Sequence, residues 1–242
     1  MVFSIKEPFS IVTDCDEVLT DISPLWVHKI QQNADYFGKY FDLSKLEGLE
    51  FGTFEHYQTV LSRPEFHLNK WLRKENLVLS DEEEKELFER FYSLYDNDEF
   101  YEDCMPTKMC EGIYKLSLQK FVDKIYVVTR TSEGTKEGKR KFIETFLNSN
   151  KVEIIFVGKN EKKSDYIKNL KNVKMIVEDE LSNINDIVEN CNDGFEEVDT
   201  YIPSTGYNNK DIDGFNENLM KKGFNAVPYV IIERPETEEK AV

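Results

Sequence analysis

The sequence predicts an α/β protein in which a parallel sheet is flanked by helices. Four short apolar runs, rich in β-branched and aromatic residues, lie at 9–13, 125–129, 153–157 and 173–177. Runs of this kind are typical of strands that are buried on both faces. Helical patterns separate the later runs, and this alternation of strands and helices is typical of βαβ units.

Amphipathic patterns predict helices at 136–148, 164–170 and 181–191, where apolar residues recur on one face. Two further strands are expected at 198–202 and 228–232. The second begins with a proline, which has no amide hydrogen to give to a neighbouring strand. We therefore expect it at an edge of the sheet.

The long stretch between the first two strands has a different pattern, with few β-branched runs and many helix-forming residues. Ser80 and Glu83 have the spacing of a capping box at the start of a helix. We therefore expect residues 1–22 and 101–242 to form the α/β core. Residues 23–100 are expected to form a mainly α-helical cap that is inserted after the first strand.

The chain has 242 residues, of which 40% are hydrophobic, and a formal net charge of -16. These values are typical of a soluble globular protein. The negative charge repels long polyanions and argues against nucleic acid as a partner. A small phosphorylated substrate is still compatible with it, because nearby cations and a bound metal dominate at short range. The sequence predicts no particular oligomeric state.

No apolar run is long enough to cross a membrane, and the first residues lack the pattern of a signal peptide. The four cysteines form no CxxC pair, which favours reduced thiols over a zinc site. We therefore expect a cytoplasmic protein without a membrane partner.

Two acidic residues, Asp14 and Asp16, directly follow the first predicted strand. In open α/β sheets, ligands bind at the carboxyl ends of strands. Two carboxylates at this spacing repel one another unless a cation or a proton intervenes, and Mg²⁺ prefers oxygen ligands. One aspartate at such a site can attack phosphorus while a second transfers protons. Taken alone, the pair is also compatible with an ordinary polar turn.

Three later segments carry polar residues at corresponding places. The second strand ends in Thr129, a lysine run with Lys159, Lys162 and Lys163 precedes a predicted helix, and acids follow the strand at 173–177. Each has an ordinary explanation when taken singly: a hydroxyl in a turn, a solvated lysine run, or acids that cap a helix. Their order, each after a predicted strand, favours one shared site.

This succession of motifs resembles that of the haloacid dehalogenase-like (HAD) phosphatase superfamily, over residues 9–15 and 107–202. The resemblance implies a HAD-like Rossmannoid sheet, a Mg²⁺ cofactor, and hydrolysis of a small phosphomonoester through an aspartyl-phosphate. Two residues depart from the usual motifs of that superfamily. Glu17 stands where glycine is common, and Glu178 stands where Asp or Gly is common.

The resemblance also implies roles for the acids. Asp14 corresponds to the nucleophile, which is also a metal ligand. Asp16 corresponds to the general acid and base, and its backbone carbonyl is expected to meet the metal. Asp179 corresponds to a further magnesium ligand, and Glu178 is expected to bind the metal directly or through water.

Three residues are expected to hold the phosphate. Thr129 corresponds to the hydroxyl that binds a phosphate oxygen, and Arg130 follows it in the same pocket. Lys163 corresponds to the lysine that offsets the charge of the nucleophile and of the phosphoryl group. Lys159 and Lys162 stay open as alternatives for that lysine.

The layout further resembles the 5'(3')-deoxyribonucleotidase branch, which has an acid-x-acid-x-Val-Leu motif and a helical cap. A nucleotide is therefore a candidate substrate, since caps of this type close over small molecules. Aromatic residues of the insertion, such as Trp26, Phe37 and Phe41, include candidates for stacking on a nucleobase. Most of them are expected to form the core of the cap.

Three alternatives stay open at this point. A catalytically silent protein could use the same fold to bind a partner. A phosphotransferase or mutase could pass the phosphoryl group to an alcohol in place of water. A polynucleotide end phosphatase is kept open by the basic residues at 136–141.

Overall fold

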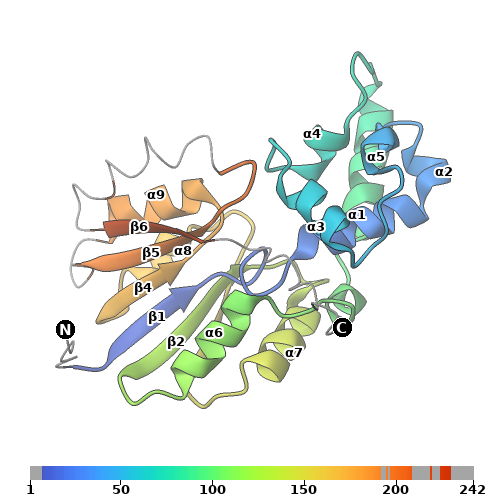
Figure 1. Ribbon diagram of the computed structural model, residues 1–242. Coiled ribbons are helices and arrows are strands. Elements are labelled where there is room, and N and C mark those ends of the chain that lie inside the picture. Colours follow the sequence, from blue (N-terminus) through green and yellow to red (C-terminus); the bar gives the residue numbers. More distant parts are fainter. Residues whose placement is uncertain (1–6, 192–194, 196, 209–218, 220–223, 230–242) are drawn as a thin grey trace, which may run out of the picture.

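The computed structural model describes residues 7–191, 195, 197–208, 219 and 224–229. Its centre is a six-stranded sheet in the order β3-β2-β1-β4-β5-β6, and all described strand pairs are parallel (Figure 1). The predicted α/β fold is confirmed. The strands are β1 (Phe9–Thr13), β2 (Val122–Arg130), β3 (Val152–Val157), β4 (Val173–Val177), β5 (Val198–Pro203) and β6 (Phe224–Tyr229).

The last strand shows where local pattern and structure differ. β6 begins at Phe224, before the predicted start at 228, and residues 230–232 lie outside the described part of the chain. Asn225 and Ala226 form strands weakly, so their pairing with β5 decides their conformation. As predicted, this strand lies at the end of the described strand order.

The path of the chain across the sheet creates the position for a site. From β1 the chain crosses to β2 and β3 on one side, and it then returns to β4 on the other side of β1. Connections leave such a switch point in opposite directions, and the gap between them at the carboxyl end is where ligands bind. The residues that follow β1 and β4 lie at this point.

Helices cover both faces of the sheet (Figure 1). These are α6 (Lys108–Ser117) and α7 (Lys136–Phe146) on one face, and α8 (Lys163–Ile167) and α9 (Leu181–Asn190) on the other. In β1, Ile11 belongs to the buried cluster that includes α6 and α7, whereas Val12 belongs to the cluster that includes α8 and α9. Successive side chains of a strand point to opposite faces, so one apolar strand supports both layers.

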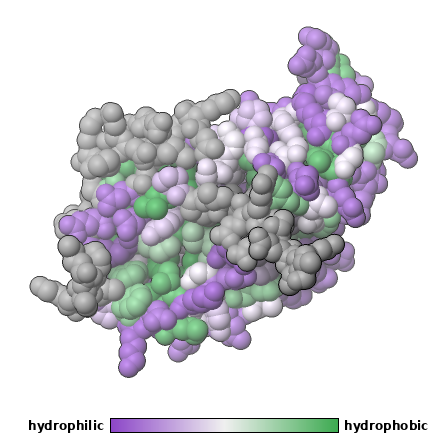
Figure 2. Space-filling view, viewed as in Figure 1, coloured by the Kyte–Doolittle hydropathy of each residue, from purple (hydrophilic) through white to green (hydrophobic). Residues whose placement is uncertain are grey.

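A helical insertion, residues 22–102, separates β1 from α6 and gathers beside the carboxyl end of the sheet (Figure 1). It consists of α1 (Ile22–Gln32), α2 (Ala34–Phe37), η1 (Leu43–Leu46), α3 (Phe54–Leu61), α4 (Leu68–Leu72), α5 (Asp81–Ser93) and η2 (Asp98–Glu102). Aromatic stacking fills its interior, as between Phe37 and Phe41, whose ring centroids are 5.5 Å apart. Figure 2 shows that hydrophilic side chains cover most of its outer face in this view.

The capping box at the start of α5 is present. The Ser80 hydroxyl accepts a hydrogen bond from the Glu83 amide at 3.3 Å, and the Glu83 carboxylate accepts one from the Ser80 amide at 2.8 Å. Two amides at the helix terminus are thereby satisfied. None of the described helices is long and apolar enough to span a membrane.

The N-cap residue of α1 makes no capping hydrogen bond with its side chain. Asp21 occupies the N-cap position, yet its side chain caps no amide, and its Oδ1 has no hydrogen-bond partner among the described residues. Burial raises the pKa of Asp21 to about 8, and the neighbouring Glu17 carboxylate adds to this effect. The folded protein therefore holds a proton on Asp21 that the unfolded chain releases near pH 4.

We expect Asp21→Asn to stabilise the protein more at pH 8 than at pH 5. Between these values the unfolded chain has lost the Asp21 proton and the folded chain keeps it, so wild-type stability falls as pH rises. Asparagine is neutral throughout and removes this penalty, which we expect to be about 1–3 kcal/mol at pH 8. Urea unfolding at both pH values measures it, with the exposed Asp35→Asn as control. An equal gain at both pH values would contradict the account.

Candidate active site

The acids predicted from strand ends meet at the switch point of the sheet. Asp14 directly follows β1, and its amide donates to the Val177 carbonyl of β4 at 2.9 Å, which extends the ladder by one residue. Glu178 and Asp179 directly follow β4, and both are buried. The parallel pairing of β1 with β4 thus brings acids that are far apart in sequence to one place.

A buried lysine joins two of these acids. Lys163, the first residue of α8, is 1% exposed, and its Nζ lies 2.7 Å from Asp14 Oδ2 and 2.7 Å from Glu178 Oε2. Burial alone lowers the pKa of Lys163, but the carboxylates of Asp14 and Glu178 outweigh it and raise the pKa above its ordinary value. The ammonium therefore stays charged.

Asp14 is held in its ionised form. Burial tends to raise its pKa, but the charge and hydrogen bond of Lys163 outweigh this, and the pKa lies below its ordinary value. The charge of Lys139 and the Cys15 amide, which donates to Asp14 Oδ1 at 2.7 Å, act in the same direction. An ionised carboxylate is the form that can act as a nucleophile or as a metal ligand.

The charge balance of this cluster fits a divalent cation. Ligand atoms of Asp14, Glu178 and Asp179 all lie within 4.8 Å of one another. If all three carboxylates were ionised, the single ammonium of Lys163 would leave two negative charges uncompensated. Burial raises the pKa of Glu178 to about 7, and burial together with the charges of Glu178 and Asp14 raises that of Asp179 well above its ordinary value. Oxygen ligands with this excess of charge suit Mg²⁺.

Neighbouring groups hold the two acids after β4 in place. The Asn183 side-chain amide donates to Glu178 Oε1 at 3.1 Å, and that of Asn208 donates to the Asp179 backbone carbonyl at 2.8 Å. The Tyr207 hydroxyl lies 3.5 Å from Asp179 Oδ2. Supporting bonds of this kind orient ligand oxygens.

Asp16 has a separate set of partners. Its Oδ2 accepts hydrogen bonds from Lys139 Nζ at 2.9 Å and from the Tyr95 hydroxyl at 2.9 Å, and its Oδ1 accepts one from the Tyr101 hydroxyl at 2.7 Å. Lys139 also donates to Thr129 Oγ1 at 3.2 Å and to the Arg130 carbonyl at 2.6 Å. Asp16 is thereby connected to both the sheet and the helical insertion.

The sequence-based prediction for Lys139 was wrong. The basic stretch 136–141 suggested an exposed patch, but Lys139 is fully buried. Burial lowers its pKa, and the Asp16 charge outweighs that effect and raises it. Lys139 precedes Phe142 and Ile143 by the spacing of one helical turn, so it lies on their buried face. That spacing is the signal that could have revealed it.

A close backbone approach allows these partners to converge. The Gly138 amide donates to Asp98 Oδ1 at 2.6 Å, and a Cβ atom at Gly138 would lie 2.2 Å from the Asp98 carbonyl oxygen. Only glycine therefore lets η2 pack against α7 at this point. The contact brings Tyr101 of η2 and Lys139 of α7 to the same carboxylate.

The remaining predicted site residues lie around one cavity. Thr129, Arg130 and Lys159 line it together with Asp14 and Lys163. Arg130 forms an ion pair with Glu180 at 3.2 Å. Lys162 instead pairs with Asp186 at 3.1 Å. Of the three candidate lysines, Lys163 is the one in contact with Asp14.

The cavity has a volume of about 790 Å³ and extends from the acids to the helical insertion. An aromatic wall, which the sequence did not reveal as a unit, lines it through Trp26, Phe66, Phe88, Phe91, Tyr92 and Tyr95. Trp26 was a candidate for stacking and does line the cavity, whereas Phe37 and Phe41 are buried in the insertion. Sites of this size and apolar character bind small molecules.

Comparison with known proteins gives no match to a family model and no significant match among curated proteins. Solved structures do match. A haloacid dehalogenase-like hydrolase from Streptococcus pneumoniae shares 13% identity, covers 90% of this chain and 93% of its own, and has a TM-score of 0.53. The chain has the HAD-like fold. A candidate phosphatase from Clostridium difficile shares 17% identity, covers 91% of this chain and 94% of its own, and also has a TM-score of 0.53.

We expect Lys139→Met to destabilise this protein by about 2–3 kcal/mol, because the Asp16 carboxylate, whose side chain is 21% exposed, loses its charged hydrogen bond. Adding Asp16→Asn to that variant should recover part of the loss, giving a coupling energy of about 2 kcal/mol in a double-mutant cycle. Urea unfolding of the four proteins measures it.

The exposed Lys136 provides the control, because Lys136→Met removes only a surface ion pair with Glu133 and should change stability by less than about 0.5 kcal/mol. Strict additivity of the Lys139 and Asp16 changes would show that the two side chains do not interact.

Proposed function

We propose that this protein is a magnesium-dependent phosphatase that hydrolyses a small phosphomonoester through an aspartyl-phosphate on Asp14. The observation that carries the proposal is the buried set of Asp14, Lys163, Glu178 and Asp179, which opens into a cavity at the switch point of the sheet. The set combines an ionised nucleophile with a cation and a place for a metal. The HAD-like fold of known hydrolases supports it.

The proposed chemistry has two steps. An Asp14 oxygen attacks phosphorus, the bond from phosphorus to the ester oxygen breaks, and the leaving alcohol takes a proton from Asp16. Water then attacks the aspartyl-phosphate and gives a proton to Asp16, which releases inorganic phosphate and restores Asp14. Lys139 and the two tyrosine hydroxyls position Asp16 for its part.

Charge stabilisation accounts for the other residues. Lys163 offsets the charge that builds up between Asp14 and the phosphoryl oxygens, while Thr129 and Arg130 bind those oxygens. Asp14, Asp179, Glu178 and the Asp16 carbonyl would hold Mg²⁺, which supplies positive charge to the phosphoryl group when bound.

Within the helical insertion, we propose that residues 23–100 form a cap domain that excludes water from the site. Its aromatic residues form one wall of the cavity, which suits a substrate with a flat or apolar leaving group, and nucleotides are among such molecules. All four cysteines are buried and unpaired, and we propose a cytoplasmic location, where thiols stay reduced.

We expect Asp14→Asn to lower kcat/KM on an aryl phosphate by more than about 10³-fold, because the amide cannot form the phosphoryl-enzyme. The exposed Asp165→Asn on α8 serves as control and should remain within about twofold of wild type. Circular dichroism establishes that both variants fold. Turnover by Asp14→Asn above a small fraction of wild type would refute the nucleophile assignment.

Removal of divalent metal with a chelator should abolish turnover, and added Mg²⁺ should restore it. Mg²⁺ should also raise the thermal midpoint of wild type by a few degrees, because binding to the folded state alone stabilises it. Asp179→Asn should remove most of this rise, whereas Glu180→Gln, next along the chain, should keep it. A midpoint of wild type that does not respond to Mg²⁺ would contradict the metal assignment.

A further inference from the structure

Glu17 has a backbone conformation that does not suit its side chain. Its φ of 57° lies in the left-handed region, where residues other than glycine are strained. The turn depends on this conformation, since it allows the Leu19 amide to donate a hydrogen bond to the Cys15 carbonyl at 2.8 Å. Glycine would meet the backbone requirement without strain. The reason for glutamate must therefore lie in its carboxylate.

Only one of the two carboxylate oxygens of Glu17 has a hydrogen-bond partner within the described chain. Glu17 is 4% exposed, and its Oε1 accepts a hydrogen bond from the Ser23 amide at the start of α1 at 2.7 Å. Its Oε2 is buried and has no hydrogen-bond partner among the described residues. An unpaired buried oxygen is costly, so strain and desolvation fall on the same residue.

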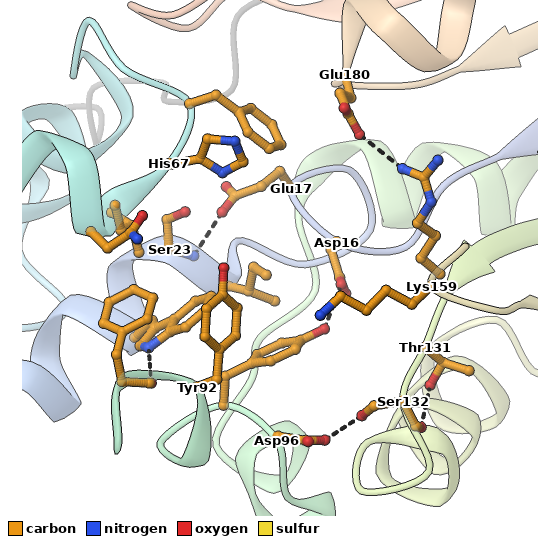
Figure 3. A pocket seen from close by; sticks show the side chains of 18 of the residues that line it. Asp16, Glu17, Ser23, His67, Tyr92, Asp96, Thr131, Ser132, Lys159 and Glu180 are labelled. Carbon is orange, nitrogen blue, oxygen red and sulfur yellow. Dashed lines mark hydrogen bonds and ion pairs between the residues drawn. The ribbon is translucent and has the colours of Figure 1, made fainter. Parts of the chain in front are cut away.

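Glu17 lines the cavity, although its unpaired oxygen is itself enclosed by protein. Figure 3 shows Glu17 directed into the cavity beside His67, with the bond to Ser23 dashed. Arg63 also lines the cavity, but its guanidinium donates to the backbone carbonyls of Val60 and Phe66 and lies 4.7 Å from the centroid of the Tyr207 ring. Its charge is near Glu17, yet no ion pair joins the two among the described contacts.

The surroundings restrict what could pair with Glu17. Ile22, Trp26, Phe66 and Leu68 line the same cavity and offer apolar and aromatic surface. Burial raises the pKa of Glu17, and a donor or cation beside Oε2 would favour its ionised form, which only accepts hydrogen bonds and rejects a carbonyl. Asp21 nearby also has a side-chain oxygen, Oδ1, with no partner among the described residues. An N–H donor therefore suits this environment, and positive charge on the donor adds to the attraction.

We propose that Glu17 is a specificity-determining residue that binds an amino group on the alcohol part of the substrate, next to its apolar or aromatic body. The inference rests on the proposed phosphatase function and adds the substrate class: phosphomonoesters of amino-bearing alcohols or nucleosides. Phosphate is held by the Asp14 end of the cavity, and the amino group is held by Glu17 within the same cavity.

Matched substrate pairs test this inference. Pyridoxamine 5'-phosphate and pyridoxine 5'-phosphate differ by an amino group in place of a hydroxyl. dCMP and dUMP differ by an amino group in place of a carbonyl. 2-Aminoethyl and 2-hydroxyethyl phosphate form a small third pair. In at least one pair we expect wild type to prefer the amino member by about tenfold or more in kcat/KM. The ratio within a pair cancels any general change in turnover.

Glu17→Gln should reduce that ratio to about one or invert it. The glutamine oxygen can keep the bond from Ser23, and its NH₂ group then takes the place of Oε2 and repels an amino donor. Glu89→Gln changes a cavity-lining but exposed carboxylate on α5 and should keep the wild-type ratio. An unchanged ratio in Glu17→Gln would overturn the inference.

Glu17→Gly provides a second variant should the glutamine protein fold poorly. It relieves the left-handed strain, so we expect a higher thermal midpoint together with loss of the amino preference. Preference retained in Glu17→Gly, or no preference in wild type for any pair, would also overturn the inference. A wild type that hydrolyses p-nitrophenyl phosphate without amino preference refutes Glu17 alone. Failure to hydrolyse any phosphomonoester refutes the phosphatase proposal itself.

Discussion

The buried ammonium of Lys163 is the interaction on which the site depends. It lies between Asp14 and Glu178, which come from the ends of two neighbouring strands, and it belongs to the first turn of α8. Without it, two buried carboxylates would face each other with no compensating charge, which is a large cost in a protein interior. The same ion pairs therefore fix the strand ends, keep Asp14 ionised, and set the charge left over for a metal.

A second buried lysine performs the corresponding task for Asp16. Lys139 compensates its charge from α7, while Tyr95 and Tyr101 bind it from the end of the insertion. The two aspartates, only two positions apart, thus belong to different electrostatic environments. This separation suits a pair in which one residue attacks phosphorus and the other moves protons. The cavity continues from there toward the aromatic wall and Glu17.

The fold was predictable because its signals are local. Apolar runs marked β1 and β4, and the alternation with helices implied their parallel pairing. Asp14 could be proposed because it directly follows β1, and Lys163 because it begins the helix that follows β3. Lys139 was missed because a lysine run resembles a solvated face, and only its spacing from Phe142 distinguishes it.

Two other features could not be found from sequence. Tyr95 and Tyr101 reach Asp16 from 79 and 85 residues away, a separation that no local pattern encodes. Glu17 was visible as a departure from glycine, yet its strain and its unpaired oxygen are properties of the folded turn.

Because η2 packs closely on α7 at Gly138, the helical insertion and the α/β core are not independent of one another. The partners of Asp16 come from the end of the insertion and from a core helix, and that contact holds them together. Asp16, the proposed proton-transfer residue, therefore has all its partners only when both parts have folded and closed a long chain loop. A foreign insertion grafted after β1 would leave Asp16 and Lys139 without their tyrosine neighbours. Exchange of this insertion between relatives thus requires exchange of its return segment as well.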